Sequence, residues 1–135
     1  MDNVFSLNVV TPNGSVYERE DVVLAVLKTT AGELGVMKGH IPTVAALNMG
    51  YVKVSLDNGS EYLAVSDGFV EIRQQKVSII VQTAEPANEI DVARAELAKS
   101  RAESHLNSDD ENSDIERAKR ALARANNRIR VANLV

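Results

Sequence analysis

Arginine side chains at helical spacing are the groups of this sequence best suited to chemistry. Arg94 and Arg101 lie seven residues apart in the alanine-rich stretch EIDVARAELAKSRAE, residues 89–103, where Asp91 precedes them. Residues three, four and seven apart share one face of an α-helix, so these side chains line one side of a first helix. A guanidinium group binds phosphate oxygens in pairs, and a carboxylate accepts from an amino group or holds an arginine in place. The pattern is compatible with a site for a phosphate-bearing ligand.

A second stripe of arginines follows near the end of the chain, at Arg117, Arg120, Arg124 and Arg128. If two helices close into a hairpin, the two stripes can face each other across its edge. Solvated helical surfaces also carry charges at these spacings, in pairs that contribute little to stability. Spacing alone leaves both interpretations open, an anion site and a solvated surface.

No other arrangement of residues points to catalysis or to a metal. The chain has no cysteine, and its two histidines, His40 and His105, have neither metal-ligand spacing nor a paired nucleophile. The glycines form neither a phosphate-binding loop nor a dinucleotide fingerprint, and the carboxylates are scattered. We therefore expect a protein that is not an enzyme and that holds no metal.

The composition fits a small globular protein with an aliphatic core. The 135 residues are 44% hydrophobic and 4% aromatic, and the net charge of −4 argues against a protein dedicated to nucleic acid. The start, MDNVFSLNVVTP, carries an acid at position 2 and no long apolar run, so we expect no signal peptide. No window is apolar enough for a membrane span, so we expect contact with a membrane only through a partner.

Residues 1–85 have the pattern of short strands joined by turns. FSLNVVT alternates in polarity, and VYEREDVVLAVLKTT is rich in β-branched residues and ends at AGELG, a glycine-bounded turn. Asn58-Gly59 is a dipeptide that favours type I′ hairpins, in which both central residues take positive φ. We expect an antiparallel β-sandwich or β-barrel over residues 1–85.

After Pro86 the period becomes helical. Asn88 with Asp91, and Ser113 with Glu116, resemble helix N-cap pairs. The apolar seam that we expect is formed by Ile90, Ala93, Leu97, Ala98 and Ala102 in the first helix and by Ile115, Ala118, Leu122, Ala125, Ile129 and Ala132 in the second. The sequence predicts an antiparallel two-helix hairpin over residues 88–135. Because an alanine-rich seam buries little area, we hypothesise that the hairpin is marginal alone and can dock in more than one place.

Four segments, VVTPNGSVYE, GELGVMKGHIPTVAAL, YLAVSDGFVEI and AEPANEIDVARAELA, together resemble the epsilon subunit of bacterial and chloroplast F-type ATP synthases. The resemblance covers nearly the whole chain. It implies a β-sandwich followed by a helical hairpin, in a non-catalytic subunit of the central stalk. The implied partners are the gamma subunit, the ring of c subunits and the alpha and beta subunits. The implied location is peripheral, on the cytoplasmic face of the bacterial membrane.

The resemblance also implies a role for each domain. The loop around His40 would contact the rotor, so that the sandwich couples the catalytic head to the c-ring. The hairpin would have two states. Folded on the sandwich it permits ATP hydrolysis, and extended into the alpha/beta ring it blocks rotation in the hydrolytic direction.

The segment IDVARA, residues 90–95, matches the ATP-binding motif I/L-D-x-x-R-A of this family. By position, the family's ATP-binding residues correspond to Glu85, Ile90, Asp91, Arg94, Ala95, Arg101, Arg124 and Arg128. ATP would be a regulatory ligand that favours the compact state, and no cofactor is required. Two rival functions remain open: a free cytosolic ATP sensor, and a structural adaptor whose arginines are only solvated. A third rival is an enzyme, which the lack of a catalytic arrangement of residues disfavours.

Overall fold

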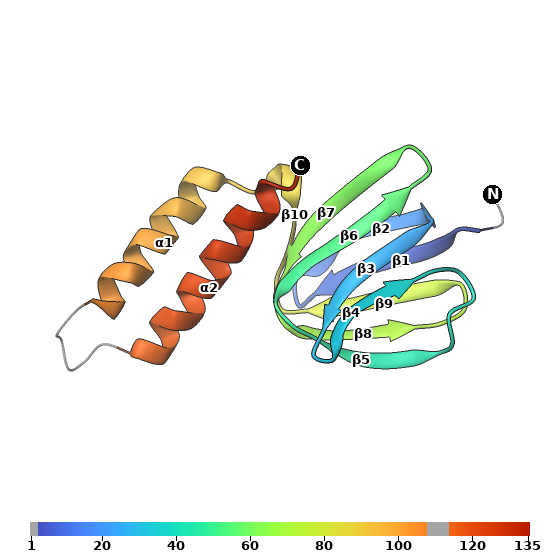
Figure 1. Cartoon of the computed structure of the whole chain (residues 1–135), viewed down its shortest axis with the longest axis horizontal. Helices are drawn as coiled ribbons and strands as arrows, with labels where there is room; N and C mark the ends of the chain where they lie inside the picture. Colours follow the sequence, from blue (N-terminus) through green and yellow to red (C-terminus); the bar gives the residue numbers. More distant parts are fainter. Residues whose placement is uncertain (1–2, 108–113) are drawn as a thin grey trace.

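The computed structural model describes residues 3–107 and 114–135, and it places a β-sandwich beside a pair of helices (Figure 1). The strands are β1 (Phe5–Thr11), β2 (Gly14–Val22), β3 (Leu24–Thr29), β4 (Gly32–Val36), β5 (Thr43–Leu47), β6 (Gly50–Leu56), β7 (Gly59–Val65), β8 (Gly68–Ile72), β9 (Lys76–Val81) and β10 (Ala84–Pro86). A short 3₁₀ helix, η1 (Ala87–Glu89), leads to α1 (Val92–Leu106) and α2 (Ile115–Ala132). The fold class predicted from the sequence is confirmed.

The core of the sandwich follows from two-residue periodicity. In β1, Phe5, Leu7 and Val9 are buried and the residues between them are partly exposed, because successive side chains of a strand point to opposite faces. The largest fully buried side chains are all leucine, isoleucine or valine, such as Leu27 and Ile79. The sandwich therefore has one aliphatic core, as the low aromatic content predicts.

The strands follow the order β10-β7-β6-β3-β5-β8-β9-β1-β2, with β4 paired to β3. Strand β1 lies between β9 and β2, and it pairs parallel to β9, with Val9 opposite Ile79. The other pairs of described strands are antiparallel. The sandwich thus contains one parallel pair that the sequence pattern does not reveal, because parallel and antiparallel partners bury the same alternating residues.

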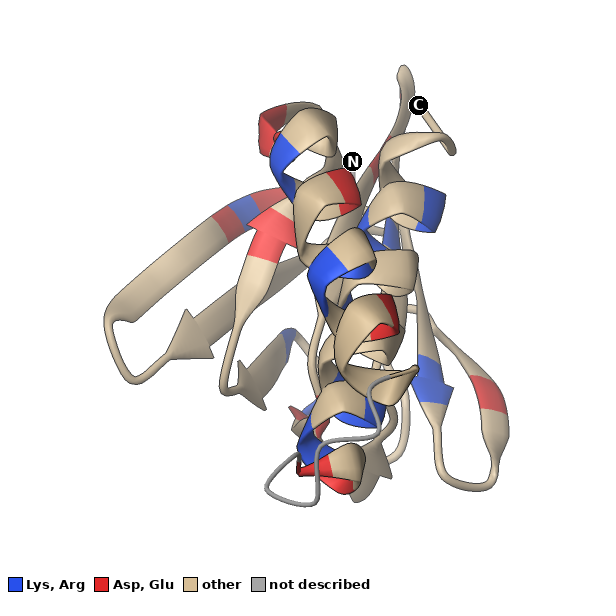
Figure 2. Ribbon diagram, turned by 90° about the vertical axis from the view of Figure 1, so that its left-hand side faces the viewer, with Lys and Arg blue, Asp and Glu red and all other residues tan. Residues whose placement is uncertain are grey.

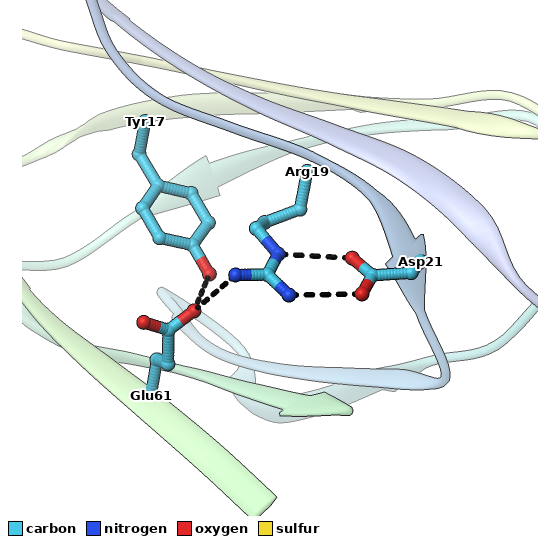
Figure 3. A network of polar contacts seen from close by, with 4 residues as sticks. All are labelled: Tyr17, Arg19, Asp21 and Glu61. Carbon is cyan, nitrogen blue, oxygen red and sulfur yellow. Dashed lines mark hydrogen bonds and ion pairs between the residues drawn. The ribbon is translucent and has the colours of Figure 1, made fainter. Parts of the chain in front are cut away.

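A polar network joins β2 and β7, which lie near opposite ends of this order (Figure 3). The Tyr17 hydroxyl donates to Glu61 Oε1 at 2.7 Å, and Arg19 Nη1 donates to the same oxygen at 3.2 Å. Arg19 also binds both carboxylate oxygens of Asp21, at 2.9 and 2.8 Å. The guanidinium lowers the pKa of the Asp21 carboxyl, chiefly through these hydrogen bonds. The network links the two ends of the strand order through side chains.

The expected turn at AGELG is wrong in its extent. Only Thr30 and Ala31 form the turn, and the remaining residues belong to β4. Gly32 takes a φ of +122°, which a residue without a side chain adopts at little cost, and it pairs with Thr29. Leu34 then packs against the core, so the segment gains more by pairing than it would as a loop.

The hairpin at Asn58 is confirmed, but its type I′ turn is wrong. Asp57 and Asn58 form the turn, while Gly59 already pairs with Leu56 and carries the positive φ of +155°. Within the described residues no residue other than glycine has a positive φ. Because Gly59, the first residue of β7, takes the positive φ, Asn58 keeps a negative φ.

Both helices begin at aspartates. The Oδ1 atom of Asp91 accepts from the backbone N–H of Arg94 at 3.0 Å, and Asp114 does the same for Arg117 at 3.0 Å. The expected cap Asn88 is wrong, because residues 87–89 form η1 and the chain is extended at the next residue. Ser113 lies outside the described residues.

The seam between the helices is narrower than predicted. Ala95 and Ala102 of α1 and Ala118 and Ala125 of α2 are buried. The predicted seam residue Leu97 is 65% exposed. Ala93 and Ile115, which the sequence also assigned to the seam, are exposed, so these predictions are wrong. Alanine on both sides shifts the contact toward the small residues, while Leu97 and Ile115 turn outward.

Gly68 is a position where the sandwich tolerates no side chain. A Cβ there would lie 2.1 Å from the backbone oxygen of Ile80 and 2.9 Å from the Cα of Val81. We predict that Gly68→Ala lowers the free energy of unfolding in urea by about 3 kcal/mol, because the backbone of β9 must move. Gly35→Ala is the matched control, since its Cβ would make one ordinary contact at 3.7 Å with Leu24. Equal midpoints for the two variants would contradict this prediction.

Tyr17 makes the stability of the sandwich sensitive to alkaline pH. Burial, followed by the hydrogen bond to Glu61, raises the pKa of Tyr17 above its ordinary value of about 10. Above that pH the unfolded chain loses the phenolic proton while the folded chain keeps it, so stability falls as pH rises. We predict that urea midpoints measured from about pH 8 to about pH 11 fall less steeply in Tyr17→Phe than in the unmodified chain. Parallel slopes would show that another group is responsible.

Candidate functional site

A cavity of about 400 Å³ lies between the helical hairpin and the edge of the sandwich. Its walls come from α1, α2 and the ends of β7 and β10, with one residue before β6. The lining residues are Met49, Ala64, Val65, Ser66, Thr83, Ala84, Glu85, Arg94, Ala98, Ala121, Arg124, Ala125, Asn127 and Arg128. The cavity therefore joins the two halves of the chain.

Small side chains leave this space open. Ala98 of α1 and Ala121 and Ala125 of α2 line the cavity with single methyl groups. A leucine or methionine at these positions would extend into the volume that they leave free. The alanine-rich seam, which limits the contact between the helices, is thus also the local cause of the cavity.

The cavity is positively charged. Arg94 from α1 and Arg124 and Arg128 from α2 line it together with one carboxylate, that of Glu85, which leaves a surplus of two positive charges. Seen from the helical end, lysine and arginine recur along both helices (Figure 2). An excess of guanidinium groups around a cavity favours an anion with several oxygens.

The arginines are engaged to different degrees. Arg128 Nε donates to Glu85 Oε1 at 3.1 Å, and its Nη2 lies 2.9 Å from the same oxygen and 3.2 Å from Oε2. Within the described residues, no hydrogen bond or ion pair engages the guanidinium of Arg94 or Arg124. These two guanidinium groups are the ones available to a ligand without breaking an existing contact.

The other residues of the expected ATP site lie beside the cavity or away from it. Ile90 is buried against the sandwich, Asp91 caps α1, and Ala95 is fully buried in the helical seam. None of these three lines the cavity, and neither does Arg101, which is exposed further along α1. The structure therefore brings together Glu85, Arg94, Arg124 and Arg128 and leaves Arg101 outside.

Sequence reasoning missed several of the residues that the sandwich and α2 add to the cavity. Met49, Ser66 and Thr83 come from segments that carry no charged motif. Ser66 Oγ accepts from the backbone N–H of Thr83 at 2.9 Å, which ties two loops together at the wall. Asn127 precedes Arg128 and gave no signal of its own. Only the packing of α2 on the sandwich identifies them.

The loop that contains His40 lies at the end of the sandwich away from the helices (Figure 1). The Nδ1 atom of His40 is 2.7 Å from the carbonyl oxygen of Ile41, and its backbone N–H donates to Met37. Large apolar side chains nearby are exposed, with Ile41 at 77% and Val44 at 72%. Exposed apolar residues of this size favour a contact with another protein.

The part of the chain that the structure describes contains no group of three His, Asp or Glu side chains placed to hold a metal ion. In the same residues, no helix is both long enough and apolar enough to cross a membrane.

Comparison with known proteins defines the family to which this chain belongs. The sequence model of the ATP synthase delta/epsilon chain β-sandwich domain matches residues 4–87, and the model of the long α-helix domain of the same chain matches residues 88–133. Together they cover nearly the whole chain, so the chain belongs to the ATP synthase delta/epsilon chain family.

Relatives with high sequence identity are epsilon chains. The chain is 80% identical to the ATP synthase epsilon chain of Staphylococcus saprophyticus and 70% identical to one from Staphylococcus aureus, each over 98% of both chains. A chain in the structure of the Euglena gracilis mitochondrial ATP synthase, which comprises OSCP, F1 and the c-ring, is 27% identical with a TM-score of 0.78. That alignment covers 98% of this chain and 82% of the other.

Proposed function

We propose that the chain is a non-catalytic subunit of the central stalk of an F-type ATP synthase. The sandwich, residues 1–85, is the rotor-binding domain, and the hairpin, residues 88–135, is the regulatory domain. The partners are the gamma subunit, the c-ring and, for the extended hairpin, the alpha and beta subunits. The complex places the chain peripherally on the cytoplasmic face of the bacterial membrane. Family membership and the Euglena structure support this proposal.

The cavity carries the second part of the proposal, which is that ATP binds there as a regulator. Its volume of about 400 Å³ is within the range of small-molecule sites. Arg94 and Arg124 supply guanidinium groups for phosphate oxygens, and the alanine methyl groups supply an apolar wall for a base. In this proposal ATP is a regulatory ligand and not a substrate.

Binding between the helices and the sandwich gives ATP a means of regulation. A ligand shifts a two-state equilibrium by the difference between its affinities for the two states. The cavity has walls from α1, α2 and the sandwich, so it exists only when the hairpin is folded down. ATP therefore favours the folded state, and its loss allows the hairpin to extend and inhibit ATP hydrolysis.

Calorimetric titration of ATP into the isolated chain tests the nucleotide site. We predict that Arg94→Ala and Arg124→Ala each weaken binding about tenfold or more, since each removes a charged hydrogen-bond donor from phosphate. Arg120→Ala is the matched control, because Arg120 is exposed on α2 and does not line the cavity. No heat at millimolar ATP would refute the site and leave the arginines as partner contacts or solvated charges.

The Arg101→Ala variant distinguishes the ATP site implied by the family resemblance, which includes Arg101, from the cavity, which does not include it. Arg101 lies outside the cavity, so the structure described above predicts little effect on ATP binding. A loss as large as that of Arg94→Ala would mean that α1 rearranges when ATP binds.

The apolar end of the sandwich generates a prediction about assembly. Ile41→Asp or Val44→Asp places a charge on a side chain that a partner would bury, so we expect gamma and c subunits to copurify about tenfold less well. Leu97→Asp is the control, because Leu97 is 65% exposed but lies on α1. Unchanged copurification of the two sandwich variants would place the rotor contact elsewhere. Absence of both partners from the unmodified chain would favour a free ATP sensor.

A further inference from the structure

The hairpin is attached to the sandwich mainly through one end of α2. Helix α2 contacts β6, β7 and η1, whereas α1 packs on α2. The residues of α1 that face the sandwich, Arg94 and Ala98, do so across the cavity. Direct docking therefore depends on α2, and the space on the α1 side is where the proposed ligand would lie.

Three residues near the end of α2, Asn127, Arg128 and Val131, make this contact, and we call them the docking face. Asn127 Nδ2 donates to the carbonyl oxygen of Gly50 in β6 at 3.0 Å. Val131 is fully buried in a cluster with Ala64, Ala87 and Ile90, with two tyrosine rings beside it. Arg128 pairs with Glu85 in β10. The docking face thus combines an apolar contact, an amide hydrogen bond and an ion pair.

These contacts differ in strength. The side chains of Arg128 and Glu85 are 27% and 35% exposed, and an ion pair so accessible to water contributes little. Val131 is 0% exposed, so its whole side chain is removed from water when α2 docks. The carbonyl of Gly50 is an acceptor at a buried position, and leaving it unpaired would be costly. We therefore expect Val131 and Asn127 to contribute most of the free energy of docking.

We propose that the docking face holds the hairpin on the sandwich without any ligand, so that the folded state is the resting state of the isolated chain. ATP then reinforces a state that already exists, through Arg94 and Arg124, and does not create it. This second statement rests on the proposed function, whereas the docking face does not. Val131 lies outside the cavity, so it sets resting docking at a position separate from Arg94 and Arg124, whereas Asn127 and Arg128 line the cavity as well.

A thiol placed under α2 measures docking directly, because the chain has no cysteine of its own. Ala87→Cys introduces one at a position that is 6% exposed and packed in the cluster with Val131. Without nucleotide, its rate of reaction with an aromatic disulfide reagent reports the population of the undocked state, even when that population is small. Val9→Cys, at a fully buried position of the sandwich core, reports unfolding of the sandwich in a parallel series.

We expect Val131→Ala to raise the reaction rate of the Ala87→Cys thiol about tenfold and Asn127→Ala about fivefold, with no change for the Val9→Cys thiol. The matched controls are Ile115→Ala, at the exposed start of α2, and Asn126→Ala, next to Asn127 but outside the cavity. Both controls should react as the unmodified background does.

The proposal is overturned if the docking-face variants leave the rate unchanged, or if they accelerate the Val9→Cys thiol equally. It is also overturned if the Ala87→Cys thiol reacts as fast as a free peptide thiol in the unmodified background. The reaction rate of the Ala87→Cys thiol in the presence of ATP is a separate measurement. Slower reaction with ATP supports the proposed regulatory site, while acceleration by Val131→Ala with no response to ATP would leave the docking face established and the nucleotide proposal refuted.

Discussion

Close packing of alanine against alanine is the constraint on which the arrangement of the hairpin depends. Ala95 and Ala102 of α1 meet Ala118 and Ala125 of α2, so the two helices approach closely but bury little apolar area. Such a pair of helices gains little stability from its own seam. The hairpin therefore depends on contacts with the sandwich. The same small side chains also leave open the cavity, where a bound ligand can add further contacts.

Stability is distributed unevenly as a result. The sandwich has a continuous core of leucine, isoleucine and valine, whereas the hairpin meets it through a small cluster around Val131 and through the segment 86–91. Elements with few buried apolar contacts open at the lowest free energy. A regulatory movement would therefore take place at the docking face and leave the sandwich intact, which suits the proposed role, in which the sandwich stays bound while the hairpin changes position.

The charge distribution adds specificity to this weak junction. The chain is acidic overall, yet the cavity gathers three arginines and one glutamate at the boundary of its two halves. Arg128 is already paired with Glu85, while Arg94 and Arg124 are not engaged within the described residues. This division separates an arginine that helps to hold the docked state from two that can respond to an anion.

The sequence by itself determined the fold class and the change from strands to helices after Pro86, because local periodicity can be read along the chain. It supplied the candidate arginines, but it did not determine that Arg94 and Arg124 line the cavity while Arg101 does not. It did not determine the parallel pairing of β1 with β9, the exposure of Leu97 or the caps at Asp91 and Asp114. The strand pairing and the exposure of Leu97 depend on competition between partners distant in sequence, whose alternating or helical patterns are equally satisfied by several arrangements. The caps are local hydrogen bonds, and which residue serves as a cap depends on where each helix begins. Only the tertiary structure decided that Asn127 and Val131 join α2 to the sandwich, since what matters there is which face of α2 lies against β6 and β7.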